Sequence, residues 1–329
     1  MPVRWMRFRP QEAALIAITA VWGSTFLLVH WAMQHSGPWF FVGVRFLVAG
    51  LISVVIFRRV LRGIRWRDIG AGVAIGVMIY LGYGLQTLGL QTIDSSTSAF
   101  ITAMYVPLVP FAQWAVFRKR PPAMAFVGAG LAFVGLLFIA GPDAFTLTLG
   151  PGEIATMIST LPIAAEIILI SLFAGKIDLG RITVIQLLTA GVLGLLTMPV
   201  AGEGVPAFSW VWVGCAVGLG AASCLIQLTM NWAQKSVSPT RATIIYAGEP
   251  VWAGVIGRIA GERLPVAALI GGALVVLGIL ASELKVVRRA GRESGRESGR
   301  ESGPESGRAP QEEKHVSGGN TAASPPPIT

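Results

Sequence analysis

Long apolar segments, separated by short polar connections, occupy most of the chain. Ten of them contain roughly 18 to 23 residues, the length at which an α-helix crosses about 30 Å of hydrocarbon. The pattern predicts transmembrane helices over residues 12–33, 38–57, 68–90, 97–117, 123–140, 152–174, 181–200, 209–231, 240–259 and 265–285. The sequence therefore predicts an all-α integral membrane protein with ten transmembrane helices.

The composition supports this class. Of the 329 residues, 53% are apolar and only 13% are charged, whereas a soluble domain carries about 25% charged residues. This scarcity of charge excludes a soluble enzyme. The C-terminal segment 288–329 differs, because it repeats Gly-Arg-Glu-Ser and becomes proline-rich near its end, so we expect a disordered tail there.

The net charge of +9 could indicate a nucleic-acid-binding protein, but the distribution of Lys and Arg favours another explanation. If the N-terminus is cytoplasmic, eighteen of the 26 Lys and Arg residues lie in the cytoplasmic segments next to the spans, two lie outside, and Arg45 lies within a span. The cytoplasmic connections of membrane proteins carry such an excess. We therefore expect both termini to be cytoplasmic, and no nucleic acid as a partner.

The chain is similar to itself at an offset of 143 residues. Ten identities in 39 positions link 97–135 with 240–278, among them Pro107 with Pro250 and Arg120 with Arg263. Each repeat contains five spans, and because five is odd, the second repeat enters the membrane from the opposite side. Inverted repeats of this kind are an architecture of secondary transporters. The predicted organisation is a basic N-terminus at 1–11, a first repeat at 12–144, an inverted repeat at 145–287 and the tail at 288–329.

Small residues and prolines predict features of helix packing. The pairs Gly72–Gly76 and Gly214–Gly218 are each expected to let two helix backbones approach closely. Pro107 and Pro250 lie near the middle of repeat-related spans. Each of these prolines should remove a backbone hydrogen bond and kink its helix.

Three ionisable side chains fall well inside the spans, namely Arg45, Glu166 and Glu249. A charge at a helix centre in a bilayer costs about 2.5 to 3.5 kcal/mol, so each needs a structural or functional reason. Glu166 and Glu249 are expected at similar depth, and either could couple export to proton entry. Alternatively, Glu249 caps the backbone around Pro250, and Glu166 is satisfied by its neighbours. Arg45 fits a structural role as well as it fits an anchor for a substrate carboxylate.

Polar and aromatic side chains inside the spans are further candidates for solute contacts. Their helical spacing would put several of them on one face of a helix. The candidates are Tyr80, Tyr83 and Thr87 in the third span, Gln227 and Asn231 in the eighth, and Tyr105 and Tyr246 in the repeat-related fourth and ninth spans. Each could equally satisfy a neighbouring helix.

Other chemistry is poorly represented. His30 and His35 have no cysteine or carboxylate at ligand spacing, so neither a metal site nor a cofactor is expected. The sequence contains no glycine-rich phosphate-binding loop with its Lys, which excludes a pump driven by a nucleotide-binding domain of its own. No cluster of His, Asp or Ser indicates catalysis, so we do not expect an enzyme.

Short motifs in the first, second and ninth spans form a recognisable combination. They are Trp22-Gly23-Ser24-Thr25-Phe26, Pro38 followed by Arg45-Phe46, and Glu249-Pro250-Val251 followed by Gly261-Glu262-Arg263-Leu264. Over nearly all of residues 12–285 the chain resembles EamA-type members of the drug/metabolite transporter superfamily. The resemblance implies a ten-helix carrier of the bacterial inner membrane, often an exporter of amino acids or related metabolites, with a central cavity lined mainly by helices 1, 3, 4, 6, 8 and 9. We expect Trp22, Ser24 and Thr25 of the first span to contact the solute. The first repeat departs from the pattern, because Val106 precedes Pro107 where Glu249 precedes Pro250.

The leading prediction is a secondary active transporter that exports small organic solutes by alternating access, embedded in the lipid bilayer as a monomer or homodimer. Efflux of drugs or cationic compounds is the alternative, and an integral membrane enzyme or a passive channel fits less well. The solute, the direction of transport, the coupling to protons, the oligomeric state and the role of the tail stay open.

Overall fold

Helices form the regular structure in the part of the chain that the computed structural model describes, where no strand occurs. This part comprises residues 10–118 and 149–262, with scattered positions between 124 and 138 and between 266 and 281. The described helices belong to one unit, Met1–Val286.

Some predictions lie beyond the reach of this description. The predicted spans over 123–140 and 265–285 fall largely outside the described residues. Residues 1–9 and the predicted disordered tail over 288–329 fall wholly outside them.

Six long, continuous helices occur within the described residues. They are α1 (Pro10–Met33), α2 (Pro38–Phe57), α3 (Trp66–Gly89), α7 (Pro151–Phe173), α8 (Leu179–Val200) and α9 (Trp210–Ala233). Two further segments are each divided into shorter helices, α4 (Ser95–Thr102) with α5 (Tyr105–Phe117) and α10 (Pro239–Tyr246) with α11 (Glu249–Ile259). A 3₁₀ helix, η1 (Val60–Gly63), connects α2 to α3.

Seven segments of the described residues are long and apolar enough to cross a membrane, the six long helices and the combined segment Ser95–Val116. The ends of the observed helices lie within two residues of the predicted boundaries. The prediction of an α-helical membrane protein with several spans is therefore confirmed.

Both divided segments break next to a proline. Pro107 has no N–H, and a proline ring clashes with the carbonyl oxygen four residues earlier, which is that of Ala103. This carbonyl oxygen instead accepts a hydrogen bond from the Val106 N–H at 3.0 Å. In the second half, the break between α10 and α11 directly precedes Pro250 in the same way. The predicted kinks are therefore full breaks between half-helices.

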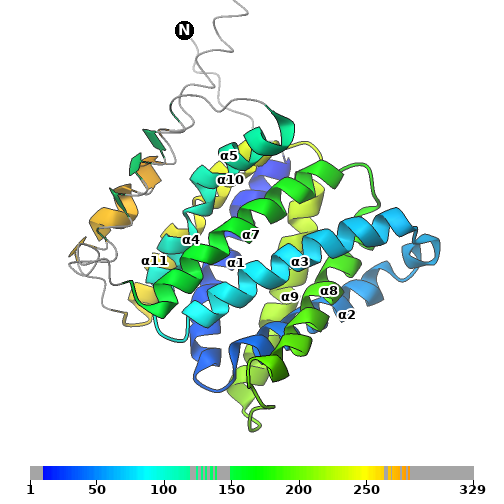
Figure 1. The fold of residues 1–329 in the computed structure, drawn as a ribbon, viewed down its shortest axis with the longest axis horizontal. Coiled ribbons are helices and arrows are strands. Elements are labelled where there is room, and N and C mark those ends of the chain that lie inside the picture. The colour runs from blue at the N-terminus through cyan, green and yellow to red at the C-terminus, as the bar shows by residue number, and fades with distance from the viewer. Residues whose placement is uncertain are drawn as a thin grey trace, which may run out of the picture. The chain divides into compact units, whose positions relative to one another are not determined.

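The packing of the helices has a two-fold pseudo-symmetry that relates the two halves of the chain. α3 packs on α7 as α9 packs on α1, and α3 packs on α8 as α9 packs on α2. α4 lies beside α11 and α5 beside α10, so the two divided segments run antiparallel to each other (Figure 1). This antiparallel pairing is what an inverted repeat requires.

Glycines allow α3 and α8 to approach closely, as predicted for the pair Gly72–Gly76. A Cβ atom at either of these glycines would lie 2.6 Å from an atom of α8. The prediction for Gly214–Gly218 is wrong, because nothing among the described residues lies within 4 Å of a Cβ atom there. Gly220 provides the close approach on α9 instead, since a Cβ atom at this position would lie 3.0 Å from the Arg45 carbonyl oxygen.

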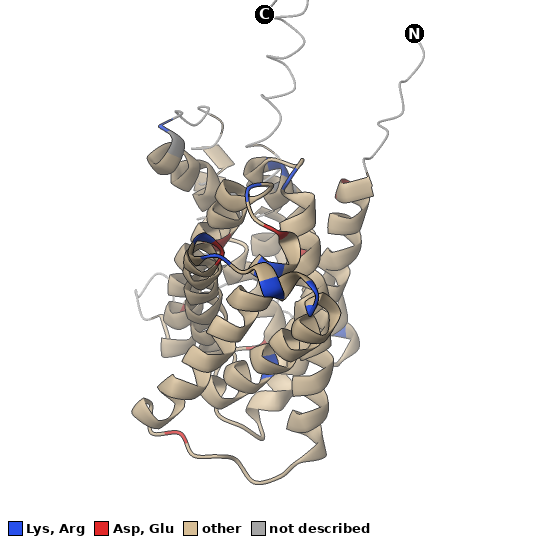
Figure 2. Cartoon of the chain, turned by 90° about the vertical axis from the view of Figure 1, so that its right-hand side faces the viewer, with Lys and Arg blue, Asp and Glu red and all other residues tan. Residues whose placement is uncertain are grey.

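Basic residues gather at one end of the bundle, which we call the basic end. It contains the connections that follow α2, α7 and α9, with Arg58, Arg59, Arg62, Arg65, Lys176 and Lys235. Figure 2 shows blue Lys and Arg positions on connections that face the viewer, whereas the long connection at the bottom of the view has a red position and no blue one. At the basic end, Arg181 Nη1 pairs with Asp68 Oδ2 at 3.3 Å and so links the starts of α8 and α3.

Candidate functional site

The breaks in the two divided segments bring a tyrosine and a carboxylate together. Tyr105 is the first residue of α5, and Glu249 is the first residue of α11. The Tyr105 hydroxyl donates a hydrogen bond to Glu249 Oε2 at 3.2 Å, and both side chains are buried.

Glu166 lies on α7 and is joined to two other helices through amide side chains. The Gln227 amide of α9 donates to Glu166 Oε1 at 2.7 Å, and the Gln186 amide of α8 donates to Gln227 Oε1 at 2.8 Å. All three side chains are buried. Glu166 and Glu249 lie within electrostatic range of each other.

Arg45 lies on α2 with 1% of its surface exposed. Its Nε donates to the Ser223 hydroxyl of α9 at 2.8 Å. The guanidinium carbon lies 5.2 Å from the centroid of the Tyr83 ring and 5.3 Å from that of Phe46, which is the range of a cation–π contact. Arg45 forms no ion pair within the described part of the chain.

Aromatic rings connect these polar groups. The ring centroids of Trp22 and Tyr83 lie 6.4 Å apart with an interplanar angle of 12°, and Trp22 meets Tyr246 edge-on at 5.6 Å. The Gln234 amide donates to the Tyr246 hydroxyl oxygen at 3.3 Å. We call the resulting group the central cluster; it consists of Trp22, Arg45, Tyr83, Tyr105, Glu166, Gln227, Tyr246 and Glu249.

Three charged side chains of the central cluster each keep a buried atom without a hydrogen-bond partner among the described residues. These atoms are Arg45 Nη2, Glu166 Oε2 and Glu249 Oε1. An unsatisfied buried polar atom costs about 1–3 kcal/mol, and more when the group is charged. Such atoms are therefore suited to bind a proton or a charged group of a solute.

Five of the predicted solute contacts lie outside the central cluster. Ser24 and Thr25 donate to carbonyl oxygens of their own helix at 2.6 and 2.7 Å. Tyr80 is hydrogen-bonded to the Thr197 hydroxyl at 2.6 Å and packs on Trp39, at the contact of α3 with α8 and α2. Thr87 is buried on α3, and Asn231 donates to the Thr183 hydroxyl of α8 at 3.0 Å.

Sequence reasoning missed Gln186. It lies in the middle of α8, is fully buried, and completes the hydrogen-bond chain to Glu166. Burying an amide in an apolar span costs desolvation free energy, as burying a charge does, but less of it. Applying the argument that identified Glu166 to uncharged polar residues would therefore have found Gln186.

The architecture and the central cluster together define a class of protein. Ionisable side chains inside a membrane span typically mark the path of an ion or a solute. Secondary transporters typically form their binding sites from divided helices at the interface between two repeats. The chain therefore has the fold and the interior of a membrane transporter.

The sequence matches the model of the EamA-like transporter family over residues 11–141 and 150–283, and the chain belongs to this family. The resemblance in its motifs is thus confirmed. With seven candidate spans among its described residues, the chain is a multi-pass membrane protein.

Relatives of the chain are named as transporters. It is 28% identical over 279 residues to an uncharacterized transporter of Archaeoglobus fulgidus, covering 84% of this chain and 86% of that protein. It is also 28% identical over 274 residues to the uncharacterized inner membrane transporter YedA of Escherichia coli, covering 79% and 87%. A Chlamydia muridarum S-adenosylmethionine/S-adenosylhomocysteine transporter is 27% identical over 161 residues, 46% of this chain and 51% of its own.

A solved crystal structure shares the fold. It aligns with a TM-score of 0.63 over 84% of this chain and 99% of its own chain, at 15% sequence identity. At this identity the likeness concerns the architecture alone.

Proposed function

We propose that the chain is a secondary carrier that exports small organic solutes, amino acids or related metabolites, by alternating access. The observation that carries this proposal is the central cluster, where Arg45, Glu166 and Glu249 each keep a buried atom without a hydrogen-bond partner among the described residues, next to the junction of two antiparallel divided segments. A junction between inverted repeats can be reached from either side of the membrane in turn, because the repeats can exchange their packing.

We also propose the complete topology. Ten transmembrane helices form two inverted repeats, at 12–144 and 145–287, and both termini are cytoplasmic. The charge asymmetry supports this orientation, since the basic end collects the arginines and lysines that cytoplasmic connections carry. The basic N-terminus at 1–11 and the tail at 288–329 then lie on the same side as the basic end.

Roles for the central cluster follow from its chemistry. Arg45 Nη2 is suited to a substrate carboxylate, and Glu166 or Glu249 to an ammonium group or the coupling proton. The rings of Trp22, Tyr83 and Tyr246 would contact the body of the solute. Ser24, Thr25, Tyr80, Thr87 and Asn231 would act around this group when the cavity opens. The Chlamydia relative supports this substrate class, because the solutes in its name contain an amino acid group.

Efflux of lipophilic cations is the second candidate function. The proximity of two carboxylates and the surrounding aromatic rings favour it, because rings and acids both attract a cation. The two functions differ in their need for Arg45, which would repel a cation but attract a carboxylate.

Counterflow into proteoliposomes tests the proposal. Vesicles loaded with one unlabelled solute are assayed for uptake of the same labelled solute, using a panel of amino acids and organic cations at two internal pH values. We expect saturable counterflow of at least one amino acid, strongly reduced in Glu249→Gln. Glu153→Gln, in the first turn of α7, is the matched control and should keep wild-type flux.

Each other outcome has a defined meaning. Flux that does not saturate indicates a channel, and counterflow of cations alone supports the second candidate. The absence of saturable flux for every solute overturns the proposal. If Glu166→Gln leaves the pH dependence of transport unchanged, Glu166 does not couple transport to protons.

A further inference from the structure

A ladder of polar side chains joins α8 to α9 between Glu166 and the basic end. Its first rung is the 2.8 Å hydrogen bond from Gln186 to Gln227, and its second is the 3.0 Å hydrogen bond from Asn231 to Thr183. On each helix the two members are three or four residues apart, so they share a face and differ in depth by about one turn, roughly 5–6 Å. All four side chains are buried.

The inner end of the ladder is Glu166. Gln227 donates to Glu166 Oε1 at 2.7 Å, while Glu166 Oε2 and Gln186 Oε1 are buried and have no partner among the described residues. Both residues are hydrogen-bonded to Gln227, and buried acceptor atoms without a protein partner are the kind of group that ordered water satisfies. The ladder is therefore continuous with the buried carboxylate.

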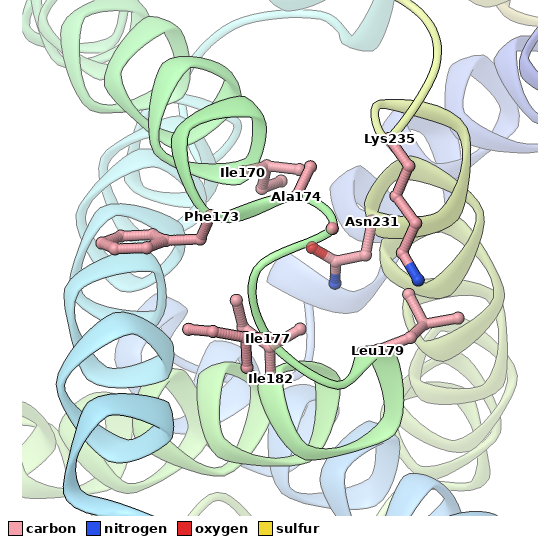
Figure 3. A pocket seen from close by; sticks show the side chains of 9 residues that line it. Ile170, Phe173, Ala174, Ile177, Leu179, Ile182, Asn231 and Lys235 are labelled. Carbon is pink, nitrogen blue, oxygen red and sulfur yellow. The ribbon is translucent and has the colours of Figure 1, made fainter. Parts of the chain in front are cut away.

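The outer end of the ladder opens into a pocket at the basic end. The pocket is small, with room for about one water molecule, and lies where α7 ends and α8 begins. Figure 3 shows Asn231 of α9 pointing toward the connection that follows Phe173, whereas Lys235, in the turn after α9, extends toward Leu179. Asn231 thus belongs to both the buried ladder and the pocket, and Lys235 is exposed at the surface.

We propose that this pocket and ladder form the route by which water and protons pass between the cytoplasm and Glu166. The inference rests on the proposed function, in which Glu166 is one of two candidates for the coupling proton. The Glu166 carboxyl group releases its proton to a water molecule held by Gln186 and Gln227, and a carboxylate remains. The excess proton then moves through water beside Asn231 into the pocket. The amides keep their own protons and serve to orient the water.

Other titratable groups face Glu166 and bear on this route. Tyr83 of α3, Tyr246 of α10 and Glu249 of α11 lie within its electrostatic range. Arg45 of α2 is attached to α9 one turn further along, through Ser223. None of these four groups lines the pocket, so a change at Asn231 alters access to Glu166 without removing any charge that faces it.

The experiment measures proton exchange at Glu166 without a solute. Infrared difference spectroscopy of the purified protein in lipid follows the carboxyl band after a change of pH, and Glu166→Gln identifies that band. Asn231→Leu replaces the amide by an apolar group of similar size, and we expect it to slow the response by about tenfold or more, since a dry segment would then interrupt the route. Asn231→Ser keeps a polar group and should restore most of the rate.

Thr229→Leu is the matched control. It lies on α9 between Gln227 and Asn231 but faces away from the ladder, where its hydroxyl bonds to the Leu225 carbonyl oxygen. We expect it to leave the rate unchanged. Thr183→Val, which removes the other member of the second rung, should slow the response as Asn231→Leu does, and monodisperse elution of each variant establishes that it is folded.

Two results would overturn the inference. One is an unchanged rate in folded Asn231→Leu and Thr183→Val, and the other is equal slowing by Thr229→Leu. Failure of the proposed function is a separate result, because the spectroscopic assay contains no solute. If transport is proton-coupled but Asn231→Leu leaves the rate of the carboxyl response unchanged, only the proposed route is wrong. If Asn231→Leu slows this response but no solute is transported, only the proposed carrier function is wrong.

Discussion

The most direct prediction concerns Glu262, which connects the two halves of the chain at the end opposite the basic end. Its Oε1 accepts hydrogen bonds from the N–H and hydroxyl groups of Ser95 at 3.1 and 2.5 Å. Its Oε2 accepts from the corresponding groups of Ser96 at 3.2 and 2.6 Å. Glu262 follows α11, and both serines begin α4, so one carboxylate caps a helix of the other half.

The magnitude follows from these four hydrogen bonds. Glu262→Ala leaves two first-turn N–H groups of α4 without their partner, and loss of a cap costs about 0.5–2 kcal/mol. Ser95 and Ser96 are fully buried, so their hydroxyls lose a partner that water cannot readily replace, and we expect about 1–3 kcal/mol in all. Glu262→Gln keeps one acceptor oxygen and should lose about half of this. A loss of 1 kcal/mol lowers the melting temperature by about 2–4 °C. From highest to lowest, the expected melting temperatures are those of the wild type, Glu262→Gln and Glu262→Ala.

The assay uses a cysteine that the fold buries. Cys224 is 4% exposed, so a fluorogenic maleimide reports unfolding in detergent when this thiol becomes accessible. Cys215→Ala removes the signal of the partly exposed second cysteine. Glu153→Ala is the control, since no hydrogen bond from this glutamate to another helix occurs among the described residues.

The effect should depend on pH in one direction. Burial on its own would raise the pKa of the Glu262 carboxyl, but the hydrogen bonds from Ser95 and Ser96 outweigh burial and hold the pKa below its usual value of 4.5. A lowered pKa contributes stability above the usual value, and this contribution is lost as the pH falls through the lowered pKa. The difference between wild type and Glu262→Ala should therefore shrink below about pH 4.5.

Tryptophan fluorescence replaces the maleimide in the acidic range, because thiols react slowly when protonated. Equal melting temperatures for wild type and Glu262→Ala at neutral pH would refute the capping argument. A difference that persists unchanged at low pH would refute the contribution of the charge.

Three further predictions concern the interior. Tyr105→Phe removes the hydrogen-bond donor to Glu249, so we expect about 1–3 kcal/mol of destabilisation in the maleimide assay, together with reduced counterflow. Gly76→Val forces a side chain against the Gln186 carbonyl oxygen, 2.6 Å from the position of a Cβ atom, and should abolish folding or lower the melting temperature severely. Gly218→Val meets no described atom within 4 Å, and its melting temperature should stay close to that of the wild type.

The spans were predictable because the bilayer sets the length of an apolar helix. The breaks were predictable only in part. Pro107 and Pro250 indicate where hydrogen bonds are lost, but whether a helix bends or stops depends on which groups then satisfy the freed carbonyls. Here the Val106 N–H donates a hydrogen bond to the Ala103 carbonyl oxygen, and a new helix, α5, begins at Tyr105.

The ionisable members of the central cluster were predictable from desolvation alone, whereas their partners were not. The cost of burying Arg45 or Glu166 follows from the residue and its span. The identity of the partner depends on which faces of α2, α7 and α9 meet. The Gly214–Gly218 pair illustrates how hard it is to predict the contacting face of a helix from its sequence. Its spacing is that of a helix contact, yet the sequence does not reveal that this face of α9 has no described helix against it.

The duplication explains the backbone of the central cluster but not its chemistry. The two divided segments are equivalent by the repeat, yet the first half has Val106 at the position of Glu249. The partner of Glu249 is instead Tyr105, the first residue of α5, which donates a hydrogen bond to it where a symmetric pair of carboxylates would repel. Under the proposed alternating access, the repeat would allow two related packings of the backbone, and the unequal side chains at the centre would make these packings differ in energy.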